Sequence, residues 1–161
     1  YTKILLNEIK TELEKELMEN WTVEATDDLE QAWTGLYINH KDWPEKVYVK
    51  LEGQSKVPWS DSIYGIIGNE KVCDRKKLSE ELAHVEFLQE NFKSNKVWPF
   101  YKTILHFGND ESRAIIFDDI KRKELALDLS ERFLELAKAC EGPLKKVHKG
   151  DRAQGAEVSL N

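Results

Sequence analysis

The stretch Lys46-Val-Tyr-Val-Lys-Leu-Glu52 decides the fold of this chain of 161 residues. Its apolar residues fall on one side of an extended chain: Val47, Val49 and Leu51. Strict alternation of this kind is typical of an antiparallel strand with one face on a hydrophobic core and one toward water. We therefore expect the apolar face to meet helices, with Tyr48 and Lys50 on the open face.

Short segments rich in Trp, Tyr, Val, Ile and Thr flank this stretch, at residues 21–24, 33–39 and 62–67. Asp42-Trp43-Pro44 separates two of them and is typical of a turn, because Pro fixes φ and has no N–H to donate. The connections are too short for crossover helices. The sequence therefore predicts an antiparallel meander in which residues 33–39 pair with residues 46–52.

Apolar residues at helical spacing predict three helices, over residues 2–19, 74–92 and 122–140, with Asp74 as an N-cap. Residues 102–107 and 113–117 are ambiguous. Gly108-Asn109-Asp110 between them permits a β-hairpin, with a helix over the first segment as the alternative.

These patterns predict a single α+β domain over residues 1–143, with an antiparallel sheet of three to five strands packed against N-terminal, middle and C-terminal helices. Residues 144–161 hold few apolar side chains and are expected to form a flexible basic and polar tail. The chain starts with Tyr, directly in a helical pattern, so we expect a further domain upstream.

The composition excludes several classes of protein. Hydrophobic residues make up 40%, which suits one core, and 24 Lys and Arg against 30 Asp and Glu give a net charge of −6. Non-specific coating of nucleic acid is disfavoured, since it depends on excess cations. No apolar run reaches the roughly 18–20 residues of a membrane span, so no membrane partner is expected. Two cysteines are too few for a disulfide framework and favour the cytoplasm.

Aromatic residues recur along the predicted strands and after the middle helix: Trp33-Thr-Gly-Leu-Tyr-Ile38, Lys41-Asp-Trp43, Val47-Tyr-Val-Lys-Leu-Glu52, Ile63-Tyr-Gly-Ile66 and Trp98-Pro-Phe-Tyr101. This pattern resembles the region C-terminal to the nuclease core in bacterial proteins of the PD-(D/E)XK nuclease superfamily, and it covers residues 5–139. The nuclease core itself is not found in the chain. The resemblance therefore implies a non-enzymatic accessory or recognition domain that binds protein or nucleic acid and needs no cofactor.

A divergent metal-dependent nuclease is the first alternative. Such an enzyme holds Mg²⁺ with two carboxylates and places a Lys near the attacking water. Asp119-Ile-Lys121 has the required spacing after the apolar residues 114–117, and Asp110 could supply the second carboxylate. The same spacing occurs at Glu8/Lys10 and Asp74/Lys76, and Asp118 and Asp119 equally suit the cap of the final helix.

A second alternative is a small interaction module whose N-terminal helix pairs with a partner helix. No other metal is expected, since the four histidines share no ligand spacing with each other or with the cysteines.

Two tryptophans lie beside prolines in predicted connections, Trp43 next to Pro44 and Trp59 next to Pro58. A Trp there either packs on the core or recognises a partner, because binding surfaces are enriched in Trp and Tyr. The predicted binding residues are Trp43, Tyr48, Lys50 and Trp59.

Overall fold

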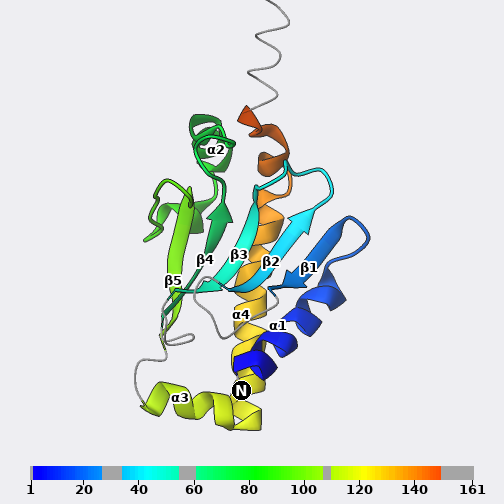
Figure 1. The fold of residues 1–161 in the computed structure, drawn as a ribbon, viewed down its shortest axis with the longest axis vertical. Coiled ribbons are helices and arrows are strands. Elements are labelled where there is room, and N and C mark those ends of the chain that lie inside the picture. Colours follow the sequence, from blue (N-terminus) through cyan, green and yellow to red (C-terminus); the bar gives the residue numbers. More distant parts are fainter. Residues whose placement is uncertain (1, 27–33, 55–60, 107–109, 150–161) are drawn as a thin grey trace, which may run out of the picture.

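The computed structural model describes residues 2–26, 34–54, 61–106 and 110–149. The helices and strands follow in the order α1 (Thr2–Glu16), β1 (Trp21–Ala25), β2 (Gly35–His40), β3 (Tyr48–Gly53), β4 (Asp61–Ile67), α2 (Arg75–Leu82), η1 (Glu86–Gln89), β5 (Phe100–His106), α3 (Asp110–Phe117), α4 (Asp119–Cys140) and η2 (Pro143–Lys146). The predicted α+β class is confirmed (Figure 1).

The five strands form one sheet in sequence order, and each strand is antiparallel to the next. Leu36 lies opposite Leu51 and Ile38 opposite Val49, which confirms the predicted pairing of residues 33–39 with residues 46–52. The last strand, β5, joins the meander only after α2 and η1, and it pairs with β4 along most of its length.

Helices α1 and α4 contact each other and cover one face of the sheet. Figure 1 views the sheet from the opposite side, with α4 passing behind the strands. The covered face holds wholly buried side chains from strands and helices, among them Val47, Val49 and Leu51 as predicted. They pack in one core with Leu5, Ile9, Leu36, Ile38, Phe133 and Leu136.

The middle helix is shorter than predicted. Asp74 caps it as expected, by accepting the N–H of Lys77 at 3.1 Å, but α2 ends at Leu82. Val85 is extended, and the chain continues as the 3₁₀ turn η1. Packing explains the break: the ring of Phe92 contacts both Phe87 and Tyr64 of β4, an arrangement that redirects the chain toward the sheet.

The predicted hairpin around Gly108 is wrong in its second half. Residues 100–106 form the strand β5, not a helix, whereas residues 110–117 form the helix α3. A short apolar run does not distinguish helix from strand. Asp110 and Glu111 lie in the first turn of α3, where carboxylates favour the helix N-terminus, and Ile116 is buried.

The predicted tail begins too early. Pro143–Lys146 form η2, and Leu144 and Val147 are completely buried. The N–H of Asp74 donates to the carbonyl of Val147 at 2.7 Å, which fastens the segment to the start of α2. The domain therefore extends at least to residue 149, because two apolar side chains spaced by three residues are enough to anchor it. The rest of the predicted tail lies outside the described residues.

Across the portion of the chain that the structure covers, no helix has both the length and the apolar character needed to cross a bilayer.

Candidate functional site

The open face of the sheet carries a hollow of about 570 Å³, a size typical of ligand sites. Its floor and walls come from alternate residues of β3, from the end of β4 and from the segment before β5. They are Tyr48, Lys50, Glu52, Gln54, Ile67 and residues 95–98.

Two glycines flank the floor of this hollow on the neighbouring strands. Gly35 of β2 lies opposite Glu52, and Gly65 of β4 lies opposite Lys50. A Cβ added to Gly35 would come within 1.9 Å of the carbonyl oxygen of Leu51. One added to Gly65 would come within 2.0 Å of the carbonyl oxygen of Phe100. Only glycine fits at these positions, because the backbone of the neighbouring strand occupies the space that a Cβ would need.

The floor is an ion pair with a hydrogen-bonded amide. Lys50 Nζ lies 2.7 Å from Glu52 Oε2, and Gln54 Nε2 donates to Glu52 Oε1 at 2.7 Å. The Lys50 and Glu52 side chains are only 11% and 6% exposed. A buried ion pair is a poor source of stability compared with apolar packing. Its value lies in the charged, ordered surface that it gives to the hollow.

Tyr48 forms one wall. Its ring packs against Tyr37 with 5.5 Å between ring centroids, and the residue is half-buried. Burial, and secondarily the charge of Glu52, raises the pKa of Tyr48 above its ordinary value. Like any tyrosine with a pKa well above neutral, Tyr48 carries a protonated hydroxyl at pH 7 that can donate a hydrogen bond.

Trp98 also lines the hollow, although only 6% of it is exposed, and it is held on a rigid support. Asn95 Oδ1 accepts the N–H groups of Val97 and Trp98 at 2.9 and 2.8 Å. The Arg75 guanidinium donates to the carbonyls of Asn95 and Lys96 at 2.9 and 2.7 Å. These bonds fix the segment against the sheet, so this part of the hollow is formed before any ligand arrives.

The structure brings together two of the four predicted binding residues, Tyr48 and Lys50. Trp59 lies outside the described residues.

Trp43 is buried, so its prediction as part of an exposed surface is wrong. Its indole N–H donates to the carbonyl of Glu141 at 3.1 Å, and its ring contacts Trp21. The turn folds back onto the end of α4, where the indole finds the acceptor that a buried Trp needs.

Sequence reasoning missed Glu52, Gln54 and Trp98 as parts of one site. Lys50, Glu52 and Gln54 are spaced by two residues, so they follow one face of β3 and the chain just beyond it. That spacing could have indicated the floor. Nothing in the local sequence indicates that residues 95–98 lie beside it.

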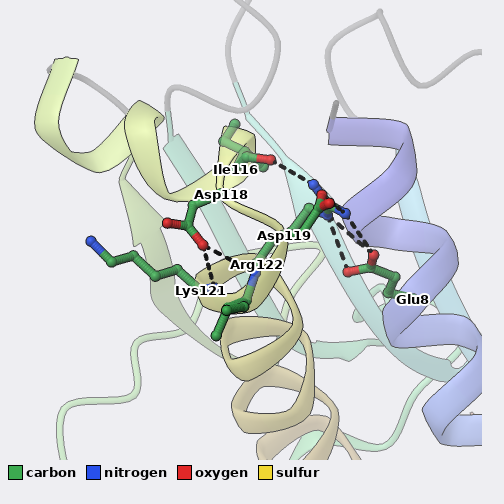
Figure 2. A network of polar contacts seen from close by, with 7 residues as sticks. Glu8, Ile116, Asp118, Asp119, Lys121 and Arg122 are labelled. Atoms are coloured by element: carbon green, nitrogen blue, oxygen red, sulfur yellow. Dashed lines mark hydrogen bonds and ion pairs between the residues drawn. The ribbon is translucent and has the colours of Figure 1, made fainter.

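The residues of the nuclease alternative have other roles (Figure 2). Asp118 caps α4, with Oδ1 accepting the N–H groups of Lys121 and Ile120 at 3.0 Å each. These bonds lower the pKa of the Asp118 carboxyl. Asp119 accepts from Arg122 at 2.9 Å, while the Lys121 side chain extends away from it. Asp110 begins α3, and the strand expected before Asp119 is that helix.

Arg122 lies between the carboxylates of Glu8 and Asp119. Its guanidinium lies 3.1 Å from Glu8 Oε1 on α1, and it also donates to the carbonyl of Ile116 at 3.0 Å. Over residues 2–26, 34–54, 61–106 and 110–149, no three His, Cys, Asp or Glu side chains gather as metal ligands would. The network in Figure 2 joins α1, α3 and α4 and is structural in character.

A second hollow, of about 560 Å³, lies between α1 and α4. Ile4 and Leu127 line it and are 43% and 48% exposed. It gives the alternative of a helix-mediated interaction a definite location.

Comparisons with family models, with curated proteins and with solved structures found no match for this chain. Its function has to be inferred from the fold and from the contacts described above.

Proposed function

We propose that this chain is a non-enzymatic recognition domain that binds a segment of a protein partner in the hollow of the open face. The observation that carries the proposal is the presence of Tyr48 and Trp98 around one hollow together with the Lys50–Glu52 ion pair. Tyr and Trp provide much of the binding energy in protein interfaces when they line well-packed pockets.

A protein partner suits the charge of the hollow better than a nucleic acid does. Lys50 is neutralised by Glu52 at 2.7 Å, and the whole chain carries a net charge of −6. Binding to nucleic acid depends on several cations that release counterions from phosphates. Among the described residues that line the hollow, only Lys50 and Lys96 are cations, which is too few for such a mechanism.

The resemblance to the region that follows a nuclease core leads us to propose that the domain is accessory to such a core. Cleavage of nucleic acid by the chain itself has less support, because Asp119 is held by Arg122 and Lys121 points away from it. Both cysteines, Cys73 and Cys140, are free thiols, which suits the cytoplasm that we propose as its location. Cleavage of DNA in Mg²⁺ that a folded Asp119→Ala variant loses would favour the nuclease instead.

Selection from a library of random twelve-residue peptides displayed on phage tests the proposal. We expect enriched peptides that bind the wild-type domain, with affinity lost in Tyr48→Ala. Phe117→Ala is the matched control, since Phe117 is an exposed aromatic residue outside the hollow. Absence of enriched peptides, or equal binding to the folded Tyr48→Ala variant, would contradict the proposal.

A further inference from the structure

We infer that the partner segment presents an acidic side chain, flanked by apolar residues, to the hollow between Tyr48 and Trp98. This inference rests on the proposed function and adds the chemistry of the ligand.

Most side-chain acceptors around the hollow already receive hydrogen bonds, with Gln54 Oε1 and the Tyr48 hydroxyl oxygen as exceptions among the described residues. Glu52 receives Lys50 on one oxygen and Gln54 on the other. Asn95 Oδ1 receives two backbone N–H groups, and the carbonyls of Asn95 and Lys96 receive Arg75. A ligand that brings only donors would find few acceptors to pair with.

Donors, in contrast, remain available. Within the described residues, no acceptor pairs with the hydroxyl of Tyr48 or with the indole N–H of Trp98. Lys96 lies at the rim, is exposed and makes no ion pair within the part of the chain that the structure covers. The hollow therefore offers two neutral donors and one cation to an incoming group.

A carboxylate is the protein group that best satisfies this set. It accepts several hydrogen bonds at once, and bonds to a charged acceptor are shorter and stronger than bonds between neutral groups.

The apolar part of the hollow indicates what flanks the acid. Ile67 is partly buried and Val97 is 44% exposed, and both line the hollow beside the donors. Apolar neighbours of the acidic residue would cover them. Lys96 is the cation without an ion pair among the described lining residues, and one such cation suits a single carboxylate and not a polyphosphate chain.

The test starts from the peptides selected on the wild-type domain. We expect Asp or Glu at one enriched position next to apolar residues. In the tightest peptide, replacing that residue by Asn or Gln should raise the Kd about tenfold in calorimetric titration, the equivalent of one charge-assisted hydrogen bond.

Conservative variants of the domain locate the acid in the hollow. Tyr48→Phe keeps the ring and removes one donor, and Trp98→Phe removes the indole N–H together with part of the ring, so each should weaken the acidic peptide more than the amide version, whose oxygen accepts a weaker bond. Tyr37→Phe is the matched control, since Tyr37 lies beside Tyr48 but does not line the hollow.

The outcomes separate the two proposals. Enriched peptides without an acid, or equal Kd values for the acid and amide versions, would overturn the inference and leave the recognition function standing. Absence of any enriched peptide would overturn both. Tighter binding of a twelve-residue oligothymidylate than of the selected peptide, at the same salt concentration, would also overturn the inference.

Discussion

The two faces of the sheet belong to the same strands but carry different kinds of side chain. On β3, Val49 and Leu51 point into the core under α1 and α4, and both are almost completely buried. Their neighbours Tyr48, Lys50 and Glu52 form the hollow on the other side. The covered face consists of apolar side chains whose burial stabilises the fold. The open face carries an ion pair, aromatic side chains and glycine neighbours, which form the proposed binding surface.

This difference leads to separable effects of mutation. Changes on the covered side should lower the free energy of unfolding. Removal of single hydrogen-bond donors on the open side should lower binding while the fold persists. The predictions below run from the largest expected effect on stability to the smallest.

The largest effect is expected for Trp43→Ala, which removes a buried ring that contacts Trp21 and donates to Glu141. Truncation of a buried Trp costs about 3–5 kcal/mol of unfolding free energy. Urea denaturation followed by circular dichroism measures it. The control Phe117→Ala, at a position 59% exposed, should change the value by less than about 0.5 kcal/mol. A small effect of Trp43→Ala would return this residue to the list of binding candidates.

The ion pair on the open face should behave differently from a core contact. Lys50→Met alone leaves the Glu52 carboxylate buried without its partner and should cost about 3 kcal/mol. The double variant Lys50→Met/Glu52→Leu removes both charges and should lie within about 1 kcal/mol of the wild type, or above it. The same denaturation experiment compares them. A double variant as unstable as the single one would show that the pair stabilises the fold.

The cap of α4, the helix that covers the sheet, should make stability depend on pH. Hydrogen bonds from Lys121 and Ile120 lower the pKa of Asp118 in the folded chain. Its ionised form therefore stabilises the fold above the ordinary aspartate pKa of about 3.9, and this contribution is lost as the pH falls through the lowered folded pKa.

Urea denaturation of wild type and Asp118→Ala across this range tests the cap. The difference in stability should be full at pH 7 and should shrink in strong acid. Asp128→Ala, in an exposed pair with Arg132, is the control and should show little difference at any pH. A difference between Asp118→Ala and wild type that does not change with pH would contradict the account of the cap.

The smallest effect on stability is expected for Tyr48→Phe. The hydroxyl has no acceptor among the described residues, so its removal should change the free energy of unfolding by less than about 0.5 kcal/mol. Affinity for the selected acidic peptide should nevertheless fall, as calorimetric titration would show. A large loss of stability would place Tyr48 with the core residues.

The sequence predicted the covered face of the sheet more completely than the open face. The alternation in residues 46–52 indicated the strand, its buried side and its antiparallel neighbour, because apolar residues recur at the spacing of the side chains that the strand buries. It also placed Tyr48 and Lys50 on the open side. It failed for Trp43, since proximity to a turn does not reveal that α4 supplies an acceptor ninety-eight residues away in sequence. It did not indicate that Trp98 lies beside the hollow, because the register of β5 against β4 brings that segment there.

Ambiguous short runs account for the remaining errors. Residues 110–117 suit a strand and a helix equally by composition, and acidic residues in the first turn favour the helix. Leu144 and Val147 are two apolar residues in a basic segment, too few to reveal that they complete the core beside α2.

The most direct measurement is nuclear magnetic resonance mapping of the bound peptide on the ¹⁵N-labelled domain, because two hollows of similar volume compete for it. If the open face is the binding surface, chemical shifts should change at Tyr48, Ile67 and Val97 and at the indole N–H of Trp98. The signals of Ile4, Ala126 and Leu127, between α1 and α4, should stay unchanged. Shift changes confined to those three residues would contradict the account and assign binding to the helices.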